Sequence, residues 1–177
     1  MSKAHDIIII GAALNGLAAA LALGGPRVKR PLDIVVVDAK DPRSFATNAF
    51  DGRASAITAA ARRMFEALGV WQQVAHEAQA MEEIIVTDSA TPGAARPVLL
   101  QFGPEDMRGG PSSHMIENRH LYGAMLAEAQ KAANIRFCVG QPVESYHFGP
   151  GLAYVMLADG TSVKASLIVA ADGRNSP

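Results

Sequence analysis

The stretch from His5 to Asp38 limits the possible folds of this chain more than any other part of it. It opens with a β-branched run, His5–Ile10, that is too short for a helix and apolar on both faces. Such a run is typical of a central strand in a parallel sheet, because both faces of that sheet are covered. A glycine-containing turn, residues 11–16, follows directly. The pattern therefore predicts a buried strand that leads into a tight turn.

The turn is followed by a predicted helix and a second predicted strand. Residues 17–23 are rich in Ala and Leu, which favours a helix, and Gly24-Gly25-Pro26 ends it. The apolar run 32–37 predicts another strand, with Asp38 at its end. This order predicts a βαβ unit of an α/β fold. A membrane-spanning helix over 7–26 is an alternative, but its glycines, its Asn and the second apolar strand argue against it.

The chemistry of this unit is that of an anion site. Gly11 and Gly16 allow backbone N–H groups to approach a diphosphate, and the helix behind them directs its positive end to the same place. Asp38 lies where a carboxylate accepts hydrogen bonds from a ribose. Ala13 stands where the dinucleotide fingerprint has a glycine, so its Cβ is expected to crowd the diphosphate. The unit predicts a dinucleotide site; an ordinary βαβ unit with a turn of small residues is the alternative.

The composition fits a globular protein and excludes several other classes. Its 177 residues are 49% hydrophobic and 19% charged, which is enough for one domain and too apolar for disorder. A net charge of -1 provides no field to attract nucleic acid. The lone Cys138 is expected to be a packed thiol, and His114 and His120 lack metal-ligand spacing, so no metal site is expected. No secretion signal is evident, and we expect a cytoplasmic protein.

The rest of the chain predicts further helices and a series of short strands. Ser55 is expected to cap a helix that ends at Gly69, and Asn118 to cap another. Residues 71–80 predict a helical segment between them. Apolar runs predict strands at 83–88, 97–102, 114–117, 135–139, 143–148, 152–157 and 167–171.

The strands from 135 to 157 decide which dinucleotide is expected. They read as an antiparallel β-meander inserted before a last, buried parallel strand at 167–171. A nicotinamide domain normally continues with strand–helix units, whereas a meander crossover is characteristic of FAD domains. The sequence therefore predicts a Rossmann-like FAD-binding domain with a parallel central sheet and an antiparallel β-meander. An NAD(P)-dependent dehydrogenase is the less favoured alternative.

Two arginines are further candidate ligand groups. Arg53 lies on the loop that leaves the second strand, on the side of a doubly wound sheet where ligands bind. It can pair with phosphate there or cover a flavin edge, and a solvated side chain is the alternative. Arg119 lies in the first turn of a predicted helix, where a cation opposes the helix dipole unless an anion compensates it.

Four stretches in this order resemble a known enzyme family. They are Ile7–Gly16 with Asp38, Asp51–Ile57, Glu117-Asn118-Arg119 with Leu121, and Ala171-Asp172-Gly173 with Ser176. The chain resembles the aromatic-ring flavin monooxygenases of the para-hydroxybenzoate hydroxylase fold. Within them it is most similar to ubiquinone-biosynthesis hydroxylases of the 2-polyprenyl-6-methoxyphenol hydroxylase type. The resemblance covers essentially all of the chain, but only about the first half of such an enzyme.

The resemblance implies FAD as the cofactor, NADPH as the co-substrate and a polyprenylated phenol as the small-molecule substrate. Asp38 would bind the adenosine ribose, and Val143 would lie near the adenine through its backbone. Arg53 and Arg119 would face the diphosphate and the flavin. The implied cofactor-binding residues are Gly11, Ala13, Leu14, Asn15, Gly16, Asp38, Ala39, Arg53, Arg119, Val143, Asp172 and Gly173. No residue presents itself as the catalytic base.

Two departures from the family pattern shape what is expected of this chain. The later Gly-Asp motif, which holds the flavin ribityl chain, and the substrate-covering sheet have no counterpart in the sequence. Residues 1–177 are therefore expected to form an incomplete FAD-binding domain, in which about 83–117 begin the substrate-side insertion. We expect this fragment to be inactive alone and to self-associate through exposed apolar surface.

The resemblance implies work at the inner face of the membrane. A non-catalytic binding or assembly protein with a nucleotide fold is the alternative from another class.

Overall fold

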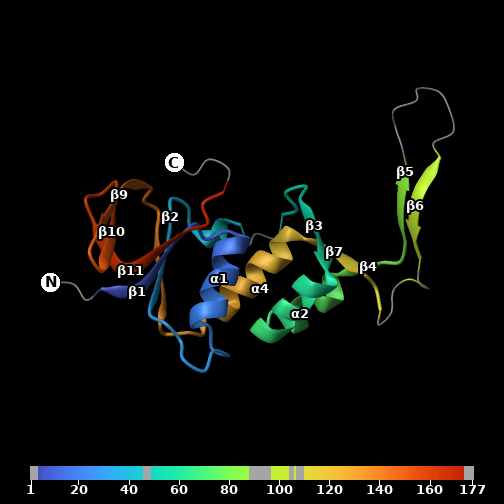
Figure 1. Cartoon of the computed structure of the whole chain (residues 1–177), viewed down its shortest axis with the longest axis horizontal. Helices are drawn as coiled ribbons and strands as arrows, with labels where there is room; N and C mark the ends of the chain where they lie inside the picture. Colours follow the sequence, from blue (N-terminus) through green and yellow to red (C-terminus); the bar gives the residue numbers. More distant parts are fainter. Residues whose placement is uncertain (1–3, 46–48, 88–96, 104–105, 107–109, 174–177) are drawn as a thin grey trace.

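A computed structural model describes residues 4–45, 49–87, 97–103, 106 and 110–173 of the chain. A six-stranded sheet lies at one end and a two-stranded ribbon projects from the other, with helices and a three-stranded sheet between them (Figure 1). The helical elements are α1 (Leu14–Gly24), η1 (Pro42–Ser44), α2 (Ala59–Leu68), α3 (Trp71–Val74), η2 (Ala75–Glu77) and α4 (Asn118–Gln130). The strands are β1 (His5–Ile10), β2 (Ile34–Asp38), β3 (Ala54–Thr58), β4 (Gln79–Met81), β5 (Ile84–Thr87), β6 (Val98–Phe102), β7 (Ser113–Glu117), β8 (Ile135–Val139), β9 (Val143–Gly149), β10 (Leu152–Leu157) and β11 (Ser162–Ala170).

The six-stranded sheet has a parallel core and the strand order β8-β2-β1-β11-β10-β9. β1 pairs in parallel with both β2 and β11, and β2 pairs in parallel with β8. The carboxyl ends of these four strands therefore meet at one edge, which confirms the predicted α/β fold. Residues 7–26 hold most of β1, the turn and α1, and within the described ranges no helix is long and apolar enough to cross a membrane.

The strand at 135–139 was wrongly assigned to the meander, since β8 lies beside β2 in the parallel core. The helix α4 precedes β8, and a parallel pair requires a crossover connection of this kind. Asn134, just before β8, ties the chain to the connection between α1 and β2. Its Nδ2 donates to the carbonyls of Gly24 at 2.8 Å and Leu32 at 2.7 Å.

The meander is confirmed, but it consists of β9, β10 and β11. β11 changes partner along its length, because Ser162–Ala165 pairs antiparallel with β10 whereas Ala165–Ala170 pairs in parallel with β1. The last strand is thus longer than the predicted run 167–171. Leu167 was expected to be buried and is 53% exposed, because α1 packs mainly on β1 and β2.

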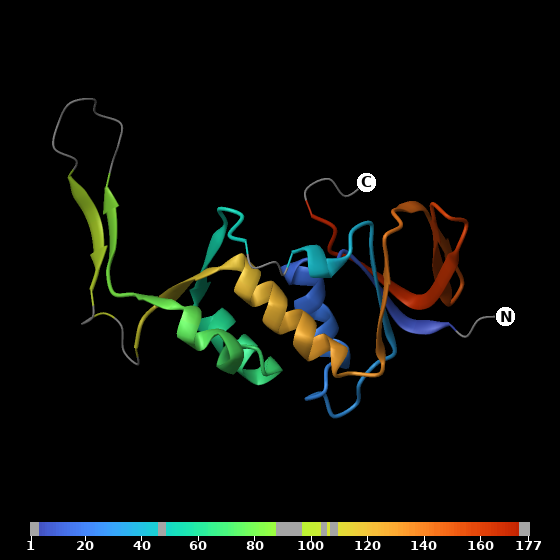
Figure 2. The ribbon, with the colours of Figure 1, turned by 180° about the vertical axis from the view of Figure 1, so that it is seen from behind.

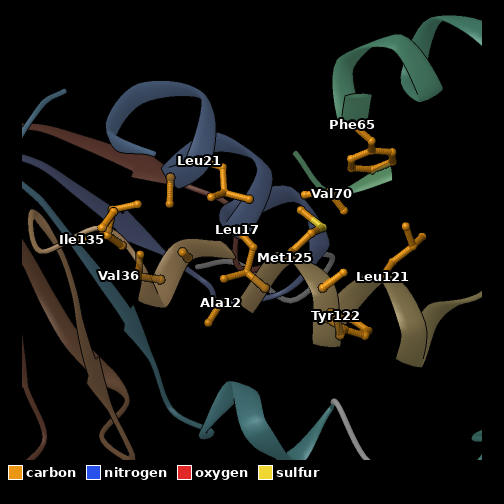
Figure 3. Close-up of a cluster of buried hydrophobic side chains, with 14 of the residues drawn as sticks. Ala12, Leu17, Leu21, Val36, Phe65, Val70, Leu121, Tyr122, Met125 and Ile135 are labelled. Atoms are coloured by element: carbon orange, nitrogen blue, oxygen red, sulfur yellow. The ribbon is translucent and has the colours of Figure 1, made fainter. Parts of the chain in front are cut away.

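The parallel sheet buries an apolar cluster on each face. Alternate side chains of a strand point to opposite faces, so Ile9 faces the helices whereas Ile8 faces the meander. On the helix side, α1 packs against α4, and Leu17, Leu21 and Met125 lie in the same buried cluster (Figure 3). This packing fixes the start of α1 at the carboxyl edge of the sheet.

The helix predicted to start at Ser55 begins later in the chain. Ala54–Thr58 form β3, which pairs antiparallel with β7, and α2 follows directly. Thr58 caps α2, because its Oγ1 accepts a hydrogen bond of 3.2 Å from the N–H of Ala61. Pairing with a strand distant in sequence overrides the local capping signal. Gly69 ends α2 with a φ of 81°, as predicted.

Two more helix boundaries differ from the predictions. Asn118 is the first residue of α4 rather than its cap, and its Oδ1 accepts a hydrogen bond of 2.6 Å from Ser55 Oγ. Glu117 holds the N-cap position without a side-chain cap hydrogen bond. The helical segment predicted over 71–80 ends at Glu77, because the next residues form β4 and pair with β7.

β5 and β6 form the antiparallel ribbon that projects from the body in both views (Figures 1 and 2). Both strands were predicted, although Asp88, the last residue of one run, lies outside the described residues. Large apolar side chains are exposed along the ribbon: Ile85, Val86, Val98, Leu99, Leu100 and Phe102. A two-stranded ribbon of this kind is marginally stable on its own in water.

Candidate cofactor site

A pocket of about 620 Å³ lies at the carboxyl edge of the parallel sheet. The ends of β1, β2 and β11, the start of α1 and the start of β9 contribute to its wall. It is lined by Ile10, Gly11, Ala13, Leu14, Asn15, Val37, Asp38, Ala39, Phe45, Tyr122, Pro142, Val143, Tyr146, Ala171, Asp172 and Gly173. The structure thus brings together all the predicted cofactor-binding residues except Gly16, Arg53 and Arg119.

The two glycines of the turn are required by close backbone approaches. Gly11 has a φ of 102°, and a Cβ there would lie 2.5 Å from the carbonyl oxygen of Ala171. A Cβ on Gly16 would lie 1.8 Å from the carbonyl oxygen of Gly11. Gly16 therefore lets α1 approach the turn, and its role is to place the helix rather than to line the pocket.

The N-terminus of α1 opens into the pocket without a side-chain cap. Ala13 holds the N-cap position and offers no acceptor, and the first turn of the helix contains no acidic residue. Leu14 and Asn15 of this turn line the pocket. Backbone N–H groups at the start of a helix are unpaired donors and carry its positive partial charge. This end of the pocket is therefore suited to an anionic group such as a diphosphate.

Asp38 stands at the end of β2 and is already bound to the backbone. Its Oδ2 accepts a hydrogen bond of 2.7 Å from Ala12 N–H, and its Oδ1 accepts one of 2.8 Å from Lys40 N–H. Each carboxylate oxygen has a second lone pair that remains available to a ribose hydroxyl. The backbone bonds hold the carboxylate in place beside the turn.

The end of β11 supplies a buried acceptor to the pocket. Asp172 Oδ1 is buried and has no hydrogen-bond partner within the described residues. A buried carboxylate oxygen without a donor is costly, so the site is suited to a ligand that carries a hydroxyl group. Gly173, with a φ of 86°, follows it in the pocket wall, whereas Ser176 of the predicted motif lies outside the described residues.

Aromatic side chains complete the pocket and were missed by sequence reasoning. Tyr146 lies on β9, and burial together with the nearby charge of Asp172 raises the pKa of its phenol. Phe45 and Tyr122 pack together with ring centroids 5.4 Å apart. No motif marks these positions, because they reach the pocket through the packing of β9, α4 and the loop after β2.

The two predicted arginines lie beside the pocket lining rather than in it. Arg53 forms an exposed ion pair with Asp51 at 2.5 Å, which lowers the pKa of that carboxyl and raises the pKa of the guanidinium. Arg119 pairs with Glu117 at 2.5 Å. Asn118 N–H donates to the carbonyl of Arg53 at 3.0 Å, so both arginines lie at the same junction of β3 and α4. Their contact with a flavin stays a prediction.

Other predicted features fall away from the pocket. Cys138 is partly buried on β8, and burial raises the pKa of its thiol. His114 packs edge-on against Trp71, and burial lowers the pKa of its imidazole. Within the part of the chain that the structure describes, no group of three or more His, Cys, Asp or Glu residues is arranged to hold a metal ion.

Comparison with known proteins gives a consistent set of relatives. Residues 4–177 match the family described as FAD binding domain. The chain is 30% identical to ubiquinone hydroxylase UbiL of Rhodospirillum rubrum over 98% of its own length and 38% of that protein. It is 25% identical to the mitochondrial ubiquinone biosynthesis monooxygenase COQ6 of Caenorhabditis elegans over 99% of its length and 39% of that protein. The chain thus spans well under half the length of these relatives.

Solved structures share the fold at low sequence identity. The chain superposes on p-nitrophenol 4-monooxygenase PnpA of Pseudomonas putida with a TM-score of 0.77 and 16% identity, covering 99% of this chain and 42% of that one. It also superposes on the flavin-dependent monooxygenase PieE, solved with FAD and substrate, with a TM-score of 0.73 and 18% identity. That superposition covers 99% of this chain and 31% of PieE. These likenesses confirm the architecture.

The residues of the pocket fit a flavin dinucleotide. The uncapped start of α1 suits a diphosphate, Asp38 suits a ribose, and the buried Oδ1 of Asp172 suits a polyol hydroxyl. The β9 side of the wall is partly apolar through Val143, as an aromatic ring requires. Together with the match over residues 4–177, this establishes that the chain belongs to the family of FAD binding domains.

Proposed function

We propose that this chain supplies the FAD site of a monooxygenase that hydroxylates a polyprenylated phenol ring in ubiquinone biosynthesis. The observation that carries the proposal is the 30% identity to a ubiquinone hydroxylase across 98% of the chain. Two further relatives bear ubiquinone-related names at 25% and 26% identity. The meander and the family match favour FAD over the nicotinamide alternative.

In this proposal the described residues bind and orient the cofactor. Backbone N–H groups at Ala13–Asn15 hold the diphosphate, Asp38 holds the adenosine ribose, and Asp172 accepts from the ribityl chain. Arg53 and Arg119, held by their carboxylate partners, face the diphosphate and flavin side. When bound, the flavin would accept a hydride from NADPH and activate O₂.

The domain organisation is part of the same proposal. The ribbon of β5 and β6, with residues about 83–117 as a whole, begins the substrate-side insertion of the full-length protein. Its exposed apolar side chains support this, because a substrate-covering region needs such a surface to pack against. In isolation, the same side chains support self-association of this chain. Light scattering at increasing concentration is expected to show oligomers. A Leu99→Lys variant places a charge on the ribbon and is expected to form fewer oligomers.

Work at a membrane surface is also proposed, since a polyprenylated substrate partitions into lipid. Cosedimentation of the full-length protein with vesicles that contain a polyprenyl phenol tests this. Binding to these vesicles supports the proposal, and a protein that stays in the supernatant contradicts it.

A ligand titration of this chain separates the candidate functions. Flavin fluorescence is followed as the chain is added to FAD. The titration with NAD is followed by calorimetry. Saturable binding of FAD without binding of NAD supports the proposal. Preference for NAD supports a dehydrogenase. If this chain binds neither ligand, the same titration on the full-length protein decides, and absence of binding there favours the non-catalytic assembly protein. In the full-length protein, one O₂ and one NADPH consumed per hydroxylated phenol, with ¹⁸O₂ label in the product, tests the reaction itself.

A further inference from the structure

The β9 side of the pocket contains Tyr146, an aromatic residue for which neither the sequence motifs nor the family match provides a role. Tyr146 lines the pocket together with Pro142 and Val143. We call these three residues the meander wall. Val143 and Tyr146 also pack against the buried cluster between the meander and the parallel sheet, which supports them from behind.

A β-bulge turns Val143 and Tyr146 to the same side of β9. Tyr146 pairs with Val155 of β10. Val143 pairs with Leu157, which makes Glu144 the extra residue between them. Val155 and Leu157 are both fully buried in the cluster under the meander, and residues directly opposite in a pair face the same side. Val143 and Tyr146 therefore both point inward, although regular alternation would place them on opposite faces.

Backbone hydrogen bonds place the meander wall beside Asp38. The N–H of Gly140 donates to the carbonyl of Asp38 at 3.0 Å. Val143 follows three residues after Gly140, and three residues span at most about 10 Å. The N–H of Ala158 donates to the carbonyl of Pro142 at 3.0 Å, which ties the start of the wall to the residue after β10. The meander wall therefore begins at the Asp38 end of the pocket.

The position and the chemistry of the meander wall suit a nucleoside base. In the proposed binding mode Asp38 holds the adenosine ribose, and the base is bonded directly to that ribose. The base therefore lies at the end of the pocket where the meander wall begins. Pro142 has no backbone N–H group and the side chain of Val143 has no polar atom, so the wall offers contact surface more than hydrogen-bonding groups. An aromatic side chain on such a wall packs well on the flat face of a base.

We propose that Tyr146 is a specificity-determining residue for the base of the cofactor, its ring packing against the adenine while Asp38 holds the ribose. This inference rests on the proposed binding of FAD. It predicts that a purine binds more tightly than a pyrimidine on the same ribose and diphosphate, because its two fused rings cover more of the meander wall.

The test compares ADP with UDP, which share the ribose and the diphosphate and differ only in the base. The parent protein is expected to prefer ADP. Loss of a contact between a base and an aromatic ring lowers an affinity by about 5- to 150-fold. Tyr146→Ala is expected to weaken FAD and ADP by a factor in that range and UDP by less, so that the preference for ADP falls. Tyr146→Phe keeps the ring and is expected to leave FAD and ADP within about twofold of the parent.

Two further variants separate contact with the base from effects on folding. Tyr146→Leu keeps an apolar side chain in the buried cluster without an aromatic ring, and it is expected to show the same fall in the preference for ADP. Tyr154→Ala is the matched control, because Tyr154 stacks on His147 with ring centroids 4.4 Å apart and does not line the pocket. It is expected to leave the affinities for ADP and UDP unchanged.

The outcomes distinguish the role of Tyr146 from the proposed function. A parent protein without preference for ADP over UDP, or equal weakening of the two by Tyr146→Ala, overturns the role of Tyr146 while binding of FAD stands. A loss in Tyr146→Phe as large as in Tyr146→Ala also overturns it, because the hydroxyl and not the ring would then make the contact. Absence of FAD binding to both this chain and the full-length protein rejects the proposed function, and this inference with it.

Discussion

The Oδ2 atom of Asp38 accepts a hydrogen bond of 2.7 Å from the backbone N–H of Ala12. This contact ties the end of β2 to the turn that follows β1, across two neighbouring strands of the sheet. A residue expected only to bind a ribose therefore also shapes the loop that receives the diphosphate. Ligand binding and local stability are coupled at this position.

Replacement of Asp38 is expected to affect both properties. Asp38→Ala leaves the N–H groups of Ala12 and Lys40 without their acceptor. This change is expected to lower the free energy of unfolding by about 1–3 kcal/mol and to lower the affinity for FAD. Urea denaturation and a FAD titration measure the two effects. Asp159→Ala is the control, because that carboxylate accepts from Thr161 N–H in an exposed turn. Equal losses of stability in the two variants would show that Asp38 has no special structural role.

Replacement of Ala13 separates helix capping from ligand binding. Ala13→Gly removes the Cβ from the pocket wall, and glycine is a better N-cap than alanine. We expect FAD to bind about threefold more tightly, which corresponds to a gain of under 1 kcal/mol, without loss of stability. Ala13→Ser is expected to stabilise α1 by about 0.5–2 kcal/mol and to weaken FAD, because its hydroxyl competes for the same N–H groups. Tighter binding by the serine variant would contradict this account.

Asn134 offers a stability test that is remote from the pocket. Asn134→Ala leaves the carbonyls of Gly24 and Leu32 without the Nδ2 donor. The expected loss is about 1–3 kcal/mol of unfolding free energy, with unchanged FAD affinity at temperatures where the variant is folded. Asn134→Asp, of similar size but with no amide donor, should lose at least as much. A stable aspartate variant would mean that the two hydrogen bonds contribute little.

Cys138 provides a test that depends on pH. Burial, and to a lesser extent the charge of Asp159, raises the pKa of its thiol in the folded state. The folded thiol should react with iodoacetamide more slowly than the unfolded one at pH 8, and Asp159→Asn should accelerate the folded reaction. The raised pKa also means that its contribution to stability is present below the ordinary thiol pKa and is lost as the pH rises through the folded value. Equal rates in folded and unfolded chains would argue against the buried environment.

The parts of the fold that were predicted correctly depend on local patterns. The unit of strand, turn, helix and acid from His5 to Asp38 is encoded in consecutive residues, and the structure reproduces it. The errors at Ser55 and at 135–139 share one cause, which is pairing between strands distant in sequence. Ser55 pairs within β3 opposite Ile116, and β8 finds β2 only after α4 has crossed over. Local propensity cannot report such partners.

The residues of the candidate site also fall into those that local patterns predict and those that only tertiary packing brings in. Its turn, its acid and Asp172 belong to motifs and were predicted, whereas Tyr146, Tyr122 and Phe45 were missed. Tyr146 reaches the pocket because Glu144 forms a bulge, and a bulge has no signature that this sequence displays. The aromatic part of the wall is a product of tertiary packing.

The change of partner along β11 has a consequence for how the molecule opens. β11 is hydrogen-bonded to β10 through its first residues and to β1 through its last residues. The meander and the parallel core therefore share this strand, and they cannot separate without loss of hydrogen bonds that β11 makes. Amide hydrogens of β1, β10 and β11 should therefore exchange with solvent through one cooperative opening. The amides of β5 and β6, in a ribbon with its own sheet, should exchange through a separate opening of lower free energy. A ligand seated at Asp172 would slow exchange in the first set and leave the second unchanged.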